Sequence, residues 1–307
     1  MKYPLNPDVL HLGFITLTWY AVFIFVGALL SYFTAQHIAK KHGYKKEILL
    51  NCFYLVFPMG ILGSRIWYVI ANYHEYKDVP FFDPNVGPLA IWNGGLAIQG
   101  GVILGAIAGV WYFMHYFPKE NKRFWADLII PNILIAQAIG RWGNFMNNEV
   151  FGVCTQKSNL WWVPDFIIKQ LQTATISSGQ ACNVSAGAVP LPLFLIEFLI
   201  NTFGFFLITW FLRNYWHKGK KPGDLGALYF VWYGAVRLIL EGFRMKDFIM
   251  TVSGEGLGST YVLSGIMVAF GLGWLVVNRI IKDPPVKDNY EYFDVLEKIE
   301  EQVENGN

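Results

Sequence analysis

Apolar residues gather in seven long stretches, which short polar segments separate. The stretches run at roughly 13–35, 48–71, 95–117, 126–146, 190–212, 225–243 and 260–281. A helix needs about twenty apolar residues to cross the hydrocarbon core of a bilayer. The pattern predicts an all-α integral membrane protein with about seven transmembrane helices. The first stretch lacks a basic leader and a small-residue cleavage site, so we expect it to be retained as a helix.

Lysine and arginine are distributed unevenly between the connecting segments. Those after the first, third, fifth and seventh stretches hold fifteen, whereas the alternate segments hold five. Cytoplasmic loops carry the excess of positive charge in membrane proteins. The alternation therefore predicts an outer N-terminus, a cytoplasmic C-terminus and an odd number of spans.

The domain organisation follows from this topology. Residues 1–283 are expected to form one polytopic transmembrane domain. The one long connection, 147–189, falls outside and predicts a small extracytoplasmic head, in which Trp161 and Trp162 suit a membrane interface. Residues 284–307 are expected to form a polar, acidic cytoplasmic tail.

Composition supports the membrane assignment and limits the possible chemistry. Hydrophobic residues make up 54% of the chain and charged residues 15%, whereas soluble proteins average about 25% charged residues. The net charge of +2 says little about partners. The three cysteines show no spacing typical of a metal site. Cys154 and Cys182 both lie in the predicted head, where a disulfide and two free thiols remain open alternatives.

Four arginines lie outside the connecting loops. Arg65, Arg141 and Arg237 fall inside predicted spans, and Arg244 lies at an outer mouth. A charge at mid-bilayer costs at least about 2.5 kcal/mol, so such residues normally face the bundle interior and a partner. At 1.5 Å per residue, these arginines lie in the outer third of the membrane. Other polar side chains at similar depth are Tyr20, Gln99 and Glu197.

One helical face in the sixth stretch carries a polar stripe. Its members, spaced i, i+4, i+8 and i+11, are Tyr233, Arg237, Glu241 and Arg244. An internal ion pair that helps the helices to pack is one interpretation. Several guanidinium groups at one depth also suit an anionic head group, because the planar fork binds phosphate bidentately and stays charged. The second interpretation predicts a site for an anionic phospholipid.

The run GRWGNFMNNEVFG at 140–152 closely resembles the signature of the prolipoprotein diacylglyceryl transferases. Its matching positions are Gly140, Arg141, Gly143, Asn144, Phe145, Asn147, Glu149 and Gly152. Other blocks of that family are resembled by WY at 19–20, GSR at 63–65, WNGGLAIQGG at 92–101 and YGAVRLILEGFR at 233–244. The resemblance extends from residue 13 to about 281.

This resemblance implies an activity and a setting. The family moves the diacylglyceryl group of phosphatidylglycerol to the lipobox cysteine thiol of prolipoproteins, the first step of bacterial lipoprotein maturation. It implies a multi-pass protein of the bacterial plasma (inner) membrane, with phosphatidylglycerol and prolipoprotein signal peptides as partners. No cofactor, metal or nucleic acid is implied.

The resemblance also implies roles for particular residues. Those expected to take part in catalysis are Arg141, Arg237, Glu241, Tyr233 and Gln99. Those expected to bind substrate are Tyr20, Arg65, Asn144, Asn147, Glu149, Gly152, Glu197 and Arg244. Arg141 and Arg237 would hold the phosphate, Asn144 and Asn147 would donate hydrogen bonds, and Glu241 would orient Arg237 or Arg244. Tyr20 would help to shape the lipid pocket, and Gly152 would let the backbone approach the substrate.

The chain departs from the family pattern at two places. Gln99 stands where the family has a histidine that is often proposed as the base, and the block Leu191–Glu197 lacks a histidine and a tyrosine. Glutamine cannot accept a proton at neutral pH, so we expect the arginines to lower the thiol pKa and Tyr233 or Glu241 to relay the proton. Two rival functions are a transporter and a non-catalytic phospholipid-binding protein. The outer position of the charges argues against the transporter, because transporter sites usually lie near the midplane.

Overall fold

The computed structural model describes residues 3–12, 15–77, 79–80, 82–83, 87–91, 94–118, 120–173, 175–176, 179–180, 182–216, 219–245 and 259–281. The predicted tail at 284–307 lies outside these residues. The chain divides into two compact units. Unit 1 comprises Met1–Val9, Thr18–Ser31 and Ala126–Lys282, and unit 2 comprises Leu10–Leu17, Tyr32–Trp125 and Asp283–Asn307.

Five helical segments in the described part of the chain are long and apolar enough to cross a membrane. They are α1 (Trp19–Lys41), α2 (Lys46–Ala71), α4 (Ile98–Tyr116), the continuous run Leu193–Tyr215, and α11 (Ser259–Ile280). The run Leu193–Tyr215 consists of α8 (Leu193–Phe205), a π-helical segment η5 (Phe206–Leu212) and α9 (Arg213–Tyr215). These five correspond to the first, second, third, fifth and seventh predicted stretches, so the chain is a mostly helical protein with membrane-spanning character.

The fourth and sixth predicted stretches differ from a simple apolar helix. The fourth is divided into α5 (Lys122–Ile129), η2 (Ile130–Asn132) and α6 (Ile133–Met146). The break coincides with Pro131, because proline lacks the amide hydrogen that a continuous helix requires. The sixth is α10 (Asp224–Glu241), which includes Arg237 among its charged residues. Seven spans and their orientation therefore stay predictions.

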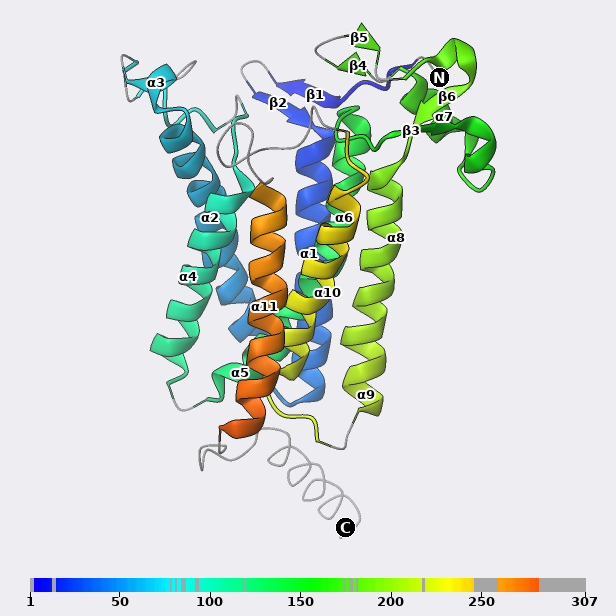
Figure 1. The fold of residues 1–307 in the computed structure, drawn as a ribbon. Helices are drawn as coiled ribbons and strands as arrows, with labels where there is room; N and C mark the ends of the chain where they lie inside the picture. Colours follow the sequence, from blue (N-terminus) through cyan, green and yellow to red (C-terminus); the bar gives the residue numbers. More distant parts are fainter. Residues whose placement is uncertain are drawn as a thin grey trace, which may run out of the picture. The chain divides into compact units, whose positions relative to one another are not determined.

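Unit 2 is organised around α2 and α4, which pack side by side (Figure 1). A Cβ on Gly100 would overlap the backbone of Gly63, and one on Gly101 would overlap the side chain of Ser64. Small residues allow such close helix contact, which explains these glycines without a ligand. After α1, Tyr44 donates a hydrogen bond of 2.8 Å to Glu120. Burial and this carboxylate together raise the pKa of Tyr44. A short helix α3 (Tyr73–Tyr76) follows α2.

Unit 1 contains the part of α5 from Ala126 onward, α6, α8, α10 and α11, with part of α1. The start of α10 is held by a carboxylate from α5. Asp127 accepts hydrogen bonds of 2.8 Å from the backbone amides of Gly223 and Gly226 at the start of α10. Asp224 binds both Arg279 Nη atoms, at 3.0 and 2.9 Å, which ties α11 to the same end. These contacts fix the helix ends farthest from the charged cluster described below (Figure 1).

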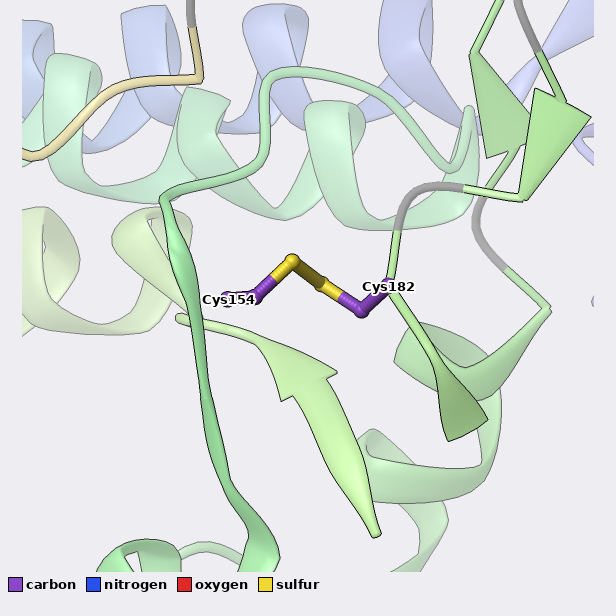
Figure 2. Close-up of a disulfide and its surroundings, with 2 residues drawn as sticks. All are labelled: Cys154 and Cys182. Carbon is purple, nitrogen blue, oxygen red and sulfur yellow. A yellow bond between two sulfur atoms is a disulfide. The ribbon is translucent and has the colours of Figure 1, made fainter. Parts of the chain in front are cut away.

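The predicted head forms a small folded layer at the start of α8 (Figure 1). Strands β3 (Cys154–Gln156) and β6 (Ala188–Pro190) pair antiparallel, with Cys154 opposite Pro190. Between them lie η3 (Lys157–Leu160), α7 (Asp165–Gln172), β4 (Thr175–Ile176), β5 (Gly179–Gln180) and η4 (Val184–Ala186). A disulfide joins Cys154 to Cys182 (Figure 2). Two further strands, β1 (Asp8–Leu12) and β2 (Ile15–Thr18), pair before α1.

Candidate functional site

The last turn and a half of α6 brings two polar side chains to one face. Arg141 and Asn144 are three residues apart, and the Arg141 Nη1 donates to Asn144 Oδ1 at 3.3 Å. Between them Gly143 leaves room for a neighbour, because a Cβ there would overlap the ring of Tyr20. Tyr20 is the second residue of α1, so this contact sets α1 against the polar end of α6.

Glu197 on α8 connects two arginines that come from different helices. Its Oε1 accepts a hydrogen bond of 2.6 Å from Arg141 Nη2, and its Oε2 accepts one of 3.1 Å from Arg237 Nη1. The Glu197 side chain is 5% exposed, whereas those of Arg141 and Arg237 are 18% and 13% exposed. A buried carboxylate needs such partners, because an isolated charge there is costly. Glu197 therefore fixes the spacing of the two guanidinium groups.

The stripe on α10 continues this chain of charges. Glu241 Oε2 lies 3.6 Å from Arg237 Nη2 and 3.5 Å from Arg244 Nη1. These separations exceed those of strong charge-assisted hydrogen bonds, which run about 2.7–2.9 Å. Neither Glu241 oxygen accepts a hydrogen bond from a described residue, although the side chain is 1% exposed. Glu241 thus has acceptor capacity that a proton, a water or a ligand could use.

The turn after α6 supplies a third carboxylate to the cluster. Glu149 Oε1 accepts hydrogen bonds from Asn144 Nδ2 at 2.9 Å and from Asn147 Nδ2 at 3.3 Å. The backbone reaches this position through two left-handed residues, Asn148 at φ 54° and Val150 at φ 61°. Asparagine tolerates this region, whereas a β-branched residue there is strained. The chain accepts backbone strain at Val150, next to the charged cluster.

Gly152 connects the turn after α6 to the residues that follow α10 through backbone contacts. It forms an antiparallel bridge with Arg244, flanked by hydrogen bonds from the Val153 amide to the Phe243 carbonyl and from the Met245 amide to the Phe151 carbonyl. A Cβ on Gly152 would meet Leu191 at 2.8 Å. The missing side chain thus lets backbone segments approach each other, and any approach of substrate to Gly152 stays a prediction.

Two cavities adjoin at this cluster. The first is about 10 Å³, room for about one water. Its charged lining residues are Arg141, Arg237, Arg244, Glu197 and Glu241. These lining residues have a net charge of +1, which suits a monoanion, whereas Glu149 does not line the cavity. The second cavity, about 400 Å³, lies between α8 with η5 and α10, has only apolar and aromatic lining residues, and shares Leu240 with the first.

Three further residues were predicted for the site: Tyr233, Arg65 and Gln99. Tyr233 stacks on Tyr229 with ring centroids 6.0 Å apart and lies near enough to Arg141 to interact with it electrostatically. Arg65 and Gln99 belong to unit 2. Gln99 is exposed near the start of α4.

Arg65 is held by contacts within its own unit. Its guanidinium donates to four backbone carbonyls, those of Gly87, Pro88, Gly94 and Gly95, at 2.6–3.2 Å. It also lies over the rings of Tyr68 and Tyr76. Arg65 therefore holds this loop in place, and a role of Arg65 in substrate binding stays a prediction.

Some features of the site were not found by sequence reasoning. Asn201 lies one turn after Glu197 on α8, is fully buried, and has neither amide atom hydrogen-bonded to a described residue. Gln137 on α6 donates a hydrogen bond of 3.0 Å to Tyr229 on α10. Their uncharged amides inside apolar stretches were the available signal. Among the described residues, no group of three or more His, Cys, Asp and Glu is placed to hold a metal ion.

Comparison with known proteins assigns a family to this arrangement. A family model described as prolipoprotein diacylglyceryl transferase matches residues 7–277. The chain belongs to the prolipoprotein diacylglyceryl transferase family. As the sequence indicated, it is a transferase. All residues of the charged cluster lie within the matched range.

Relatives named phosphatidylglycerol–prolipoprotein diacylglyceryl transferase support this assignment over nearly the whole length. One from Streptococcus suis (strain 05ZYH33) is 36% identical over 276 residues, covering 90% of this chain and 93% of the relative. One from Streptococcus agalactiae serotype Ia is 36% identical over 277 residues, and one from Streptococcus pyogenes serotype M5 is 34% identical over 275 residues. Each of these two alignments covers 90% of this chain and 96% of the relative.

Proposed function

We propose that this protein transfers the diacylglyceryl group of phosphatidylglycerol to the lipobox cysteine thiol of prolipoproteins, in the plasma membrane of a bacterium. The observation that carries the proposal is the buried Arg141–Glu197–Arg237–Glu241–Arg244 cluster, in a chain of this family. The relatives' names specify the lipid and the prolipoprotein as their substrates. Seven spans with an outer N-terminus would place the cluster near the outer leaflet, where the lipid phosphate lies.

The reaction is a substitution at a saturated carbon. The thiolate sulfur attacks the glycerol carbon that carries the phosphate ester, forming a C–S bond while the C–O bond breaks. The oxygen takes the electron pair and leaves as glycerol phosphate. The thiol proton is lost before or during attack, and the released phosphate monoester can accept it. Such a step needs a group that stabilises negative charge on the leaving phosphate and an environment that favours the thiolate.

Arg141 and Arg237 fit the first requirement. A guanidinium has five N–H donors, and Glu197 uses one nitrogen of each. Arg141 Nε has no hydrogen-bond partner among the described residues, so a phosphate oxygen can bind without displacing Glu197. The net charge of +1 on the residues that line the cavity matches the single negative charge of a phosphodiester. Because the charged cavity holds only about one water, lipid binding must widen it.

The apolar cavity fits the lipid's acyl part. It adjoins the charged cavity at Leu240, so a lipid phosphate and an acyl chain can be bound by neighbouring parts of unit 1. Its lining is aliphatic and aromatic, which suits a hydrocarbon chain. Because the two cavities share this wall, one lipid could occupy both cavities.

Glu241 is our proposed proton relay in place of the histidine that Gln99 replaces. Its oxygens accept no hydrogen bond from the described residues and lie 3.5–3.6 Å from two arginines. A carboxylate with free acceptor positions at this place can take the proton from the thiol and pass it on. Tyr233 remains the second proposed participant, through its position near Arg141.

The experiment that tests this function uses purified protein in detergent, phosphatidylglycerol and a lipobox peptide. Glycerol phosphate release and peptide lipidation are measured together. We expect both products in equal amounts, which would also show that Gln99 is no barrier to transfer. Lipid binding without either product would contradict the proposal and favour a non-catalytic phospholipid-binding protein.

A further inference from the structure

A short segment of the head exposes three aromatic side chains, which we define as the aromatic patch: Trp161, Trp162 and Phe166. Trp161 is 87% exposed, Trp162 39% and Phe166 42%. Tryptophan is usually well buried in folded proteins, because exposing its large ring to water is unfavourable. An almost fully exposed tryptophan with two aromatic neighbours therefore indicates a surface that is covered in the protein's working environment.

The patch is held outward by a rigid core. The residues between and beside its members are buried: Leu160 is 4% exposed, Val163 6% and Ile167 1%. They pack in one hydrophobic cluster with residues of α6, α8 and β6. These residues form the inner, buried side of the segment. The outward aromatic residues are thus a second apolar face, of which Phe166 also contacts Phe145 of the core.

Charge beside the patch favours an anionic partner. Lys157 and Lys169 are exposed on either side of it in the sequence. They are two of the five basic residues in the segments predicted to lie outside. Asp165 partly offsets them, but it lies 3.9 Å from Lys157 and is 82% exposed, so this ion pair contributes little. The local excess is one positive charge.

The patch is close to the surface that faces hydrocarbon. It follows β3, which pairs with β6, and β6 leads directly into α8. The outer end of α8 lies beside β3 and α7 in Figure 1. Along its length, α8 exposes Leu199 and Phe203, with exposed fractions of 49% and 61%. The patch thus belongs to a head that leads into a helix with apolar side chains exposed along its length.

We propose that the aromatic patch docks the head onto the outer leaflet of the bilayer, with Trp161 and Trp162 at the level of the lipid head groups and Lys157 and Lys169 against anionic phospholipids. Tryptophan is enriched at this level because its ring is apolar while its N–H remains hydrated. The proposal requires that the chain be embedded in a bilayer and does not depend on the transfer reaction.

The test measures the fluorescence emission of one tryptophan as the difference between two proteins. Trp161→Phe keeps an apolar ring at the patch but removes one of the 12 tryptophans, so wild-type minus variant emission reports Trp161. Both proteins are placed in nanodiscs of phosphatidylglycerol and phosphatidylcholine, with acyl chains brominated near the head group or near the chain end. We expect head-group-proximal bromine to quench most of the difference emission, and terminal bromine to quench much less.

Trp142→Phe provides a matched comparison, because Trp142 packs against Phe194 and Phe198. We expect its difference emission to be quenched less than that of Trp161 by head-group-proximal bromine. Iodide quenching of Trp161 in bilayers, with no effect of brominated lipid, would overturn the proposal. Shielding from iodide only when a lipobox peptide is added would also overturn it and assign the patch to the peptide. Transfer activity of Trp161→Phe in detergent should equal that of the wild type, so this test can fail separately from the proposed function.

Discussion

At the scale of single residues, one carboxylate organises the site. Glu197 holds Arg141 and Arg237 at the same time, with N–O distances of 2.6 and 3.1 Å. Each arginine depends on Glu197 for its ion pair with another helix. Without the Glu197 charge, Arg141 would lose this ion pair, and Arg237 would keep only the one with Glu241. The arginines would then repel each other and lose the orientation that a phosphate requires.

Glu197→Gln should lower transfer activity. The variant weakens two charge-assisted hydrogen bonds worth about 1.5–3 kcal/mol each, so we expect at least about a tenfold fall in kcat/KM. Glu197→Asp should not restore activity, because the shorter side chain cannot bridge both arginines. Glycerol phosphate release measures the effect, with Glu75→Gln on the exposed α3 as control. Wild-type activity in Glu197→Gln would show that the bridge is dispensable.

Val150→Asn should raise the temperature of unfolding. Val150 has φ 61°, and a non-glycine residue in the left-handed region costs about 1–3 kcal/mol. Asparagine adopts this region more readily and places a polar group against a polar cavity. Thermal unfolding in detergent measures the change, and Val153→Asn, at an exposed position without this backbone angle, is the control. A lower unfolding temperature for Val150→Asn would mean that packing of the valine outweighs its strain.

At the scale of elements, the head and the helices are stabilised in different ways. The helices pack through small residues, such as Gly234 on α10 against Ser264 and Val268 on α11. The head has a small apolar core and two-stranded sheets, which alone are marginally stable. The disulfide between Cys154 and Cys182 crosses this layer and closes a loop with a sequence separation of 28.

Cys154→Ser should destabilise the head. Loop closure over this length contributes about 3.5 kcal/mol, so we expect earlier proteolysis within residues 153–189 and a lower unfolding temperature. Reduction of the wild type with dithiothreitol should reproduce the loss. The same treatment of Cys154→Ser should add nothing. An additional effect of the reductant on the variant would contradict this account.

Ala235→Trp should weaken lipid binding. Ala235 lines the apolar cavity between α8 and α10, and the indole would fill space that an acyl chain is expected to use. We predict a several-fold higher KM for long-chain phosphatidylglycerol and a smaller change for a short-chain analogue. Ala106→Trp, on a groove of α4 in the other unit, is the matched control. Equal effects of both variants would argue against an acyl site at α10.

Sequence periodicity predicted those parts of the site that share one helix. The spacing of Arg237, Glu241 and Arg244 predicted one helical face. In the structure α10 ends at Glu241 and Arg244 follows it, and Glu241 still joins both arginines. Contacts between distant segments were beyond the sequence. The pairing of Glu197 with Arg141 depends on how α6 and α8 pack, and the Asp127 carboxylate caps a helix start 96 residues away at Gly223.

At the scale of the whole molecule, charge is placed at specific ends of the helices. The Arg141–Glu197–Arg237 cluster lies at the head end of unit 1, and the Asp127 and Asp224 contacts hold the opposite end. Polar contacts therefore link the helices at both ends, and the small charged cavity lies at the head end. The predicted orientation would put this cavity at the outer leaflet, where a prolipoprotein cysteine and a lipid phosphate can meet.

The most direct test of the central claim compares Arg141→Lys and Arg237→Lys with the wild type. Lysine keeps the positive charge but loses the planar fork that holds a phosphate. We predict that each variant retains the wild-type fold and still binds phosphatidylglycerol, while kcat for glycerol phosphate release falls by about 10²–10³-fold, as for loss of one charge-stabilising donor. Transfer at wild-type rates in both variants would contradict the assignment of the cluster to the leaving phosphate.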